Sequence, residues 1–112
     1  MTATKLIELD PGKYSLLLDA GSTQVDDIIA DLEHEPNGYF WAGVARRLVA
    51  TEAQHLEGRF GYDPEAGMFC AYGTDREALA ELGGLLDAVA SDGERIRAIV
   101  AEAEAEGFDF DD

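Results

Sequence analysis

The sequence predicts an α+β fold in which two ββαα units form one antiparallel sheet packed by about four helices. Its length of 112 residues suits a single domain, 1–112, with one core. Short apolar runs bounded by turn residues alternate with helical patterns, in the order strand, strand, helix, helix, and this order occurs twice. No pattern of a parallel strand–helix–strand unit and no phosphate-cradling glycine motif is present.

The first strands are expected at 5–9 and 14–18, where apolar residues flank a turn that contains Pro11 and Gly12. The segment 20–23 then breaks the strand and offers a hydroxyl as a helix N-cap. A helix is predicted from the spacing i, i+3, i+4, i+7, with an end at 35–38 where a proline and a glycine occur. The residues on its apolar side are Val25, Ile28, Ile29 and Leu32.

A second helix is predicted over about 39–50, and four of its residues are expected to point inward: Trp41, Val44, Ala45 and Leu48. Three consecutive aromatic residues begin it, and on a helix they point about 100° apart, so they cannot all face one core. We expect at least one of these rings to be partly exposed or to lie under a neighbouring element. Gly43 permits another element to approach closely.

The second half repeats this order, with strands expected at 59–62 and 68–72. Thr74 with Glu77, and Ser91 with Glu94, have the spacing of capping boxes, each of which predicts a helix start. The apolar residues of the two helices that follow lie at helical spacing: Ala78, Leu79, Leu82, Leu85, Leu86 and Val89 in one, and Ile96, Ile99, Val100 and Ala103 in the other.

Charge is the unusual property of this composition. Aspartate and glutamate number 24 against 8 lysines and arginines, for a net charge of −16. Such a surface repels phosphates and anionic lipid, so we expect no nucleic-acid or membrane partner, and it attracts basic proteins. A single cysteine excludes an internal disulfide, and no apolar run has the length of a signal peptide or membrane span, so the expected location is the cytoplasm.

Catalytic candidates are few. Cys70 would be a nucleophile with His34 or His55 as its base, but it lies in an apolar strand, where a free cysteine is usually a small buried hydrophobe. Asp63 and Glu65 flank Pro64 and form either an acid/base pair or an ordinary turn, and the turn is favoured. Zinc-ligand spacing is absent and the segment 109–112 resembles only half of a calcium loop, so no metal or other cofactor is expected.

The carboxylates are concentrated in two places. Asp27, Asp31 and Glu35 are spaced i, i+4, i+8, on the side of the first helix away from its apolar residues. The C-terminal segment 102–112 carries six acids and no base: Glu102, Glu104, Glu106, Asp109, Asp111 and Asp112. Either group is a solvated face that maintains solubility or a surface for a basic ligand. Phe108 and Phe110 within the segment would supply apolar anchors, form a terminal strand or dock on the core.

Several of these segments together resemble the immunity protein 51 family of bacterial polymorphic-toxin systems. They are the segments from Gly38 to Ala45, from Phe60 to Gly73, from Tyr14 to Asp19 and from Gly107 to Asp112. The resemblance implies a small cytoplasmic protein, encoded beside a toxin, that binds this toxin and blocks it without catalysis. It identifies neither the toxin nor the contact residues.

From the charge we expect the toxin to be basic and the contacts to come from acidic residues and one aromatic. The expected partner-binding residues are Asp27, Asp31, Glu35, Trp41, Asp63, Glu65, Glu102, Glu106, Asp109, Asp111 and Asp112. Two other functions stay open: an acidic nucleic-acid mimic that inhibits a basic DNA- or RNA-binding protein, and a small hydrolase that uses Asp63 with Glu65, or Cys70.

Overall fold

Four antiparallel strands form one sheet in the order β1-β2-β4-β3 in the computed structural model, which describes residues 3–112. The strands are β1 (Thr4–Asp10), β2 (Lys13–Asp19), β3 (Gly61–Tyr62) and β4 (Met68–Gly73). The first hairpin is confirmed, and its turn places Gly12 at a φ of 80°, a conformation that glycine adopts without steric cost. The predicted α+β fold with a single antiparallel sheet is therefore confirmed.

The helices follow the predicted order. They are α1 (Asp26–Asp31), α2 (Gly38–Glu52), α3 (Arg76–Ala90) and α4 (Gly93–Ala105), with a short 3₁₀ helix, η1 (Gln54–Leu56), between α2 and β3. The order ββαα therefore occurs twice along the chain, as the alternation of strand and helix patterns predicted.

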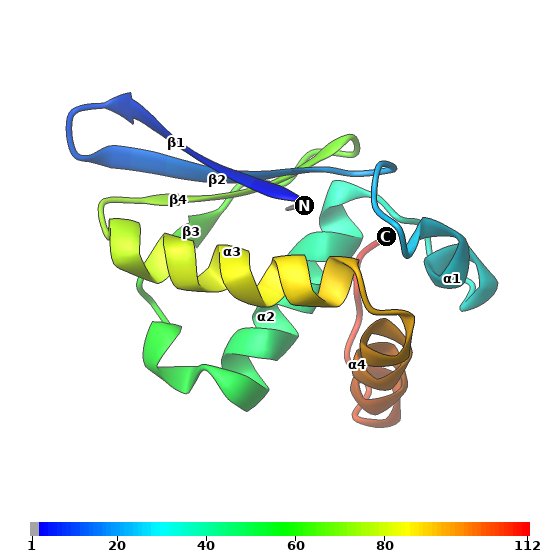
Figure 1. The fold of residues 1–112 in the computed structure, drawn as a ribbon. Helices are drawn as coiled ribbons and strands as arrows, with labels where there is room; N and C mark the ends of the chain where they lie inside the picture. Colours follow the sequence, from blue (N-terminus) through cyan, green and yellow to red (C-terminus); the bar gives the residue numbers. More distant parts are fainter. Residues whose placement is uncertain (1–2) are drawn as a thin grey trace.

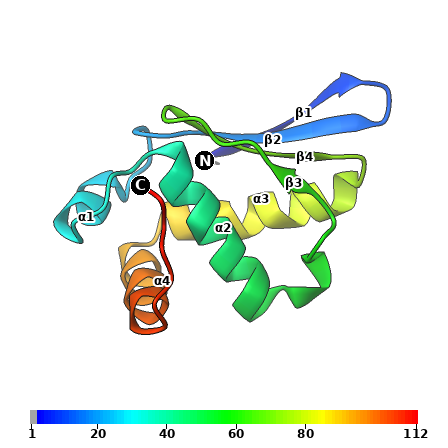
Figure 2. The same ribbon diagram turned by 180° about the vertical axis from the view of Figure 1, so that it is seen from behind.

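The helices lie on one side of the sheet, as Figures 1 and 2 show from opposite directions. Helix α3 packs along β1, β2 and β4, whereas α2 contacts β4 and crosses α3. Helices α4 and α1 pack against each other farther from the sheet. None of the described residues forms a helix on the opposite side of the sheet, so that side faces solvent.

Strand register decides which side chains enter the core. Leu16 pairs with Leu6 and Ala71, and Leu18 pairs with Phe69, and these side chains face the helices. Because side chains alternate along a strand, the intervening residues point to the solvent side of the sheet. Helix α3 contributes Leu79, Leu82 and Leu86 to the core, α4 contributes Ile96 and Val100, and all of these are buried.

Helix α2 begins in close contact with the connection between β3 and β4. Asn37 caps the helix, because its side-chain oxygen accepts a hydrogen bond of 2.9 Å from the Phe40 N–H. Gly38 donates its N–H to the Ala66 carbonyl, and a Cβ atom on Gly38 would lie 1.9 Å from the Glu65 carbonyl oxygen. Only glycine therefore fits at this helix start.

Helix α1 is shorter than predicted, with six residues, and the expected hydroxyl cap is wrong. Its N-cap is Val25, which makes no side-chain capping bond, and the Thr23 hydroxyl binds the Asp26 carboxylate instead of a backbone amide. The helix stops because Glu33 adopts a φ of 67°, which is incompatible with a continued right-handed helix. The chain then turns toward the C-terminal segment.

Both predicted capping boxes are also wrong, although the two helices whose starts they predicted are present. Helix α3 is capped by Asp75, whose carboxylate accepts from the Ala78 N–H at 3.0 Å. Helix α4 is capped by Asp92, which accepts from the two N–H groups at 94 and 95. Aspartate caps as well as a hydroxyl residue, so the cap lies one residue later than Thr74 and Ser91.

Strand β3 has two residues instead of the four expected at 59–62. The N–H of Arg59 donates to the Leu56 carbonyl at the end of η1, so the chain is still turning when it reaches Phe60. Pairing with β4 therefore begins only at Gly61.

Candidate functional site

The acidic C-terminal segment is docked on the body of the protein. Phe110 is 2% exposed, and its ring stacks on Phe40 with 5.0 Å between the ring centres. Gly43 makes room for it, since a Cβ atom there would lie 2.6 Å from the Phe110 ring. Figure 2 shows the segment running back beside α2 after α4 ends. Of the alternatives left open for Phe108 and Phe110, docking on the core is the one observed.

His34 ties this segment to the turn after α1. Its Nδ1 lies 2.9 Å from a carboxylate oxygen of Asp112, and its Nε2 lies 3.1 Å from one of Glu104. The Glu35 N–H donates to the other Asp112 oxygen at 2.7 Å. Carboxylates only accept hydrogen bonds, so the protonated ring, which donates from both nitrogens, is the form that satisfies both partners.

The pKa values of this group follow from its geometry. Burial acts to lower the pKa of His34, but the hydrogen bonds that the ring donates to Asp112 and Glu104, together with their negative charges, outweigh it and raise the pKa above the ordinary 6.5. For Asp112, burial acts to raise the pKa, but the Glu35 N–H and the His34 ring stabilise the anion and lower the pKa below 3.8. Each partner therefore favours the charged form of the other.

The expected acidic row on the first helix does not form. Asp27 and Asp31 are exposed on α1, but Glu35 lies beyond the end of the helix and is exposed on the turn that follows. The three carboxylates therefore share no helix face, because α1 ends at Asp31.

Other carboxylates of the C-terminal segment are engaged within the chain. Glu106 and Glu102 lie 3.1 and 3.9 Å from the Arg47 guanidinium, which is mostly buried and sits over the Phe108 ring. Asp109 accepts from the Asp111 N–H at 2.9 Å, and both of these residues are exposed. Internal partners thus engage Glu102, Glu106 and Asp112, whereas Asp109 and Asp111 keep exposed carboxylates.

Trp41 was expected to contact a partner, and this expectation is wrong. Its side chain is fully buried and packs edge-on against Phe40, with 5.8 Å between the ring centres. Its indole N–H has no hydrogen-bond partner among the described residues. Tyr39, 40% exposed, is the aromatic of this stretch that reaches the surface.

Asp63 and Glu65 lie on the connection from β3 to β4, and both are exposed. The Asp63 N–H donates to the Cys70 carbonyl at 2.9 Å, and Glu65 and Met68 exchange backbone hydrogen bonds. A two-residue turn is present, but it lies at 66–67 between the paired Glu65 and Met68 and not at the expected position around Pro64. Its carboxylates border the solvent side of the sheet, where they line a hollow together with Cys70.

Cys70 has no histidine beside it in the described structure. His34 is held between two carboxylates, and His55 binds Glu81 at 2.6 Å. Burial raises the pKa of the Cys70 thiol; a hydrogen bond with Ser15 opposes this, while the charges of Asp63 and Glu65 add to it. The thiol is therefore not activated as a nucleophile.

The solvent side of the sheet, here called the outer sheet face, is a feature that the sequence reasoning missed. Its apolar residues alternate with core residues, so these strands are apolar on both sides. Such continuous apolar runs were the sequence signal that could have predicted this face. The face comprises Lys5, Ile7 and Leu9 of β1, Lys13, Ser15 and Leu17 of β2, and Met68, Cys70 and Tyr72 of β4.

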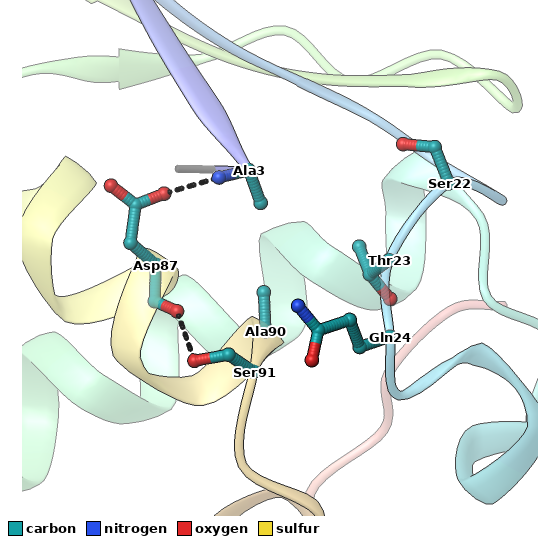
Figure 3. Close-up of a pocket in the computed structure, with 7 residues that line it drawn as sticks. All are labelled: Ala3, Ser22, Thr23, Gln24, Asp87, Ala90 and Ser91. Atoms are coloured by element: carbon teal, nitrogen blue, oxygen red, sulfur yellow. Dashed lines mark hydrogen bonds between the residues drawn. The ribbon is translucent and has the colours of Figure 1, made fainter. Parts of the chain in front are cut away.

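A smaller hollow of about 120 Å³ lies where the first strand meets α3, and Figure 3 shows its lining residues. Asp87 dominates it: one of its oxygens accepts from the N–H groups of Ala3 and Thr4 and from the Thr4 hydroxyl, at 2.8–2.9 Å. This carboxylate anchors the start of β1 to α3, which is a structural role.

Across residues 3–112, no group of three or more histidine, cysteine, aspartate or glutamate side chains is arranged to hold a metal ion. Within the same residues, no helix combines the length and the apolar character needed to cross a membrane.

The structure defines a small α+β domain with one open antiparallel sheet, and comparison with known families gives its class. Residues 4–105 match the family model described as Immunity protein 51. The chain therefore belongs to the Immunity protein 51 family. Neither among curated proteins nor among solved structures was a significant match found.

Proposed function

We propose that this protein is a single immunity domain that acts in the cytoplasm, where it binds a cognate bacterial toxin and neutralises it stoichiometrically, without catalysis. The observation that carries this proposal is the family match, which spans residues 4–105. An immunity function implies a toxin partner, and inhibition by binding requires only a stable surface complementary to it.

The charge supports a basic toxin as the partner. A surface with net charge −16 attracts a basic domain and speeds their encounter, especially where the toxin has a cleft that binds phosphates. Within the acidic set expected from the sequence, some carboxylates are exposed and have no ion pair among the described residues: Asp27, Asp31, Glu35, Asp63, Glu65, Asp109 and Asp111. We propose these as the charged groups that attract the toxin.

Growth rescue and a titration test the proposal together. Expression of the toxin encoded beside this protein is expected to stop growth, and co-expression of the protein to restore it. In a purified assay, toxin activity is expected to reach zero at one protein per toxin. An unrelated basic enzyme of similar charge is the control and should keep its activity.

The end point of the titration separates binding from catalysis. Full inhibition at a small fraction of one equivalent would contradict stoichiometric binding and favour a catalytic inactivator. Cys70→Ser is expected to protect as well as the wild type. A neighbouring protein that is harmless, or that the protein does not inhibit, would overturn the proposed function.

A further inference from the structure

The outer sheet face is more apolar than an exposed sheet face should be. An antiparallel sheet covered on one side usually alternates apolar and polar residues, with the polar ones toward water. Here the outward positions include Ile7, Leu9, Leu17, Met68, Cys70 and Tyr72. Leu9 is 65% exposed and Tyr72 is 48% exposed. Exposed apolar area of this kind on a small protein marks a place where another molecule binds.

The shape of this face is also suited to a ligand. Tyr72 leans over Gly61 on the neighbouring strand, where a Cβ atom would lie 2.6 Å from the tyrosine ring. Two adjoining hollows of about 560 and 430 Å³ open on the face, and they share four lining residues: Leu9, Ser15, Asp63 and Cys70. The face therefore offers recesses for protruding side chains.

Both lysines of the chain lie on this face. They are Lys5 and Lys13, and neither forms an ion pair with a described residue. Three of the six arginines pair with a carboxylate, namely Arg47, Arg59 and Arg95, whereas Arg46, Arg76 and Arg97 form no ion pair with a described residue. In a chain with three acids for every base, two unpaired lysines leave positive charge available to a partner.

Strand register gives these charges a definite order. One row across the sheet runs from Lys5 through Leu17 and Cys70 to Asp63, because Lys5 pairs with Leu17, Leu17 pairs with Cys70, and the Asp63 N–H binds the Cys70 carbonyl. Positive charge thus lies at the β1 side, apolar side chains at the centre and negative charge at the β3 side. A complementary partner has the opposite order.

We propose that the cognate toxin docks on the outer sheet face, with an apolar centre against Leu17 and Cys70, a basic group at Asp63 and Glu65, and an acidic group at Lys5. This inference rests on the proposed function and assigns the surface that performs it. The exposed carboxylates on α1 and in the C-terminal segment then steer the encounter from outside the contact.

A second copy of the chain fits this face less well. Two copies, each with charge −16, repel each other, whereas a basic toxin is attracted.

Binding of a catalytically inactive toxin variant to three protein variants tests the proposal. Leu9→Asp and Tyr72→Ala change exposed residues of the face, so the fold should tolerate them. Ala101→Asp adds the same carboxylate as the first variant at an exposed position of α4, away from the sheet. We expect the dissociation constant to rise about 30-fold or more for the face variants, as for a residue that contributes strongly to an interface, and to stay within about twofold for Ala101→Asp.

Alkylation of the unaltered protein gives a second measurement that no folding defect can mimic. The rate at which a small maleimide labels Cys70 is expected to fall about tenfold or more in the complex, because the toxin covers the thiol. Wild-type affinity of both face variants together with an unchanged labelling rate would overturn the proposal while leaving the proposed function intact. A toxin-free dimer that Leu9→Asp abolishes would also overturn it, in favour of a second copy. If the inactive toxin does not bind at all, the proposed function fails, and this inference fails with it.

Discussion

At His34, one imidazole ring joins two segments that lie about seventy residues apart in the chain. Both ring nitrogens face carboxylates, and the ring also packs edge-on against Phe110, with 5.0 Å between ring centres. The same residue therefore provides charge pairing and apolar contact for the C-terminal segment. Its protonation state consequently governs how firmly this segment is held.

The free energy of unfolding is expected to depend on pH through this group. The raised pKa of His34 means that its stabilisation is complete below pH 6.5 and is lost as the pH rises through the folded-state value. The lowered pKa of Asp112 means that its stabilisation is complete above 3.8 and is lost as the pH falls through its folded-state value. The stabilisation from this group is therefore greatest between pH 3.8 and pH 6.5.

Urea unfolding of the wild type at a pH of about 6 and of about 9 tests this expectation, with a lower midpoint expected at the higher pH. His34→Gln should remove most of this difference. His55→Gln is the matched control, because His55 and Glu81 are both largely exposed and such pairs contribute little. An unchanged pH dependence in His34→Gln would contradict the role assigned to His34.

Three glycines in helices differ in the atoms that an added methyl group would contact. Their alanine variants should therefore differ in the free energy of unfolding. Gly38→Ala is expected to cost about 3 kcal/mol, since two backbone carbonyls would lie 1.9 and 2.3 Å from the new Cβ atom. Gly43→Ala should cost about 1–2 kcal/mol, because the obstacle is the Phe110 side chain, which can shift. Thermal unfolding measures both.

Gly84→Ala is the control for these two variants. Nothing lies within 4 Å of its Cβ position, and alanine is the better helix former, so a gain of about 0.5–1 kcal/mol is expected. If Gly38→Ala were as stable as the wild type, the close contact between α2 and the β3–β4 connection would be wrong.

Among the elements, strand β1 is an edge strand that depends on a side chain of α3. The Asp87 carboxylate accepts three hydrogen bonds from the beginning of this strand, and β1 is otherwise paired only with β2 in the described sheet. The outer sheet face includes three residues of this strand. The position of β1 therefore affects the proposed docking surface.

Asp87→Ala is expected to loosen β1 locally, at a cost of about 1–2 kcal/mol for the lost hydrogen bonds. Hydrogen exchange should become faster for amides of β1 and stay unchanged for those of β4. Asp87→Asn keeps an accepting oxygen and should lie between the wild type and the alanine variant. Equal exchange in all three proteins would show that another contact holds the strand.

Periodicity in the sequence predicted most elements correctly but not their ends. Helices α2, α3 and α4 and the first hairpin were predictable because each has a long apolar pattern of its own. The end of α1 was not, since it depends on the left-handed Glu33 and on contacts with Asp112 and Glu104. A local pattern carries no information about contacts between segments so far apart.

The candidate site was less predictable than the fold for the same reason. Trp41 points inward, as its place on the second helix predicted, but it was also expected to contact a partner, which its complete burial contradicts. Gly43 admits Phe110 beside Phe40, and the docked segment helps to close the core there. The outer sheet face was overlooked because strands that are apolar on both sides do not reveal, one at a time, which residues face the core. Register, which requires the paired strands, decides which residues do.

On the scale of the whole molecule, excess negative charge surrounds a less acidic sheet face. Self-repulsion among 24 carboxylates opposes folding, while long-range attraction speeds the approach of a basic partner. Salt screens both effects, since the screening length is about 10 Å at 0.1 M. Added salt is therefore expected to raise the stability of the folded protein and to slow its association with a basic partner.

Raising sodium chloride from about 0.05 to 0.5 M is expected to increase the melting temperature, because repulsion within the folded protein is screened. Over the same range the association rate constant with the toxin should fall about tenfold or more, while the dissociation rate constant changes little. Stopped-flow mixing measures the association rate constant. Displacement by excess unlabelled protein measures the dissociation rate constant. An association rate that does not depend on salt would rule out electrostatic steering.

The burial of Trp41 gives the protein a built-in optical reporter. It is the single tryptophan of the chain, and its ring is shielded from water and lies against Phe40, which in turn stacks on Phe110. Its emission should be blue-shifted in the native state and should respond when the C-terminal segment detaches. Because the ring lies on the helix side of the sheet, a toxin bound to the outer sheet face would leave this emission unchanged. The emission of Trp41 therefore distinguishes detachment of the C-terminal segment from formation of the complex, without any added label.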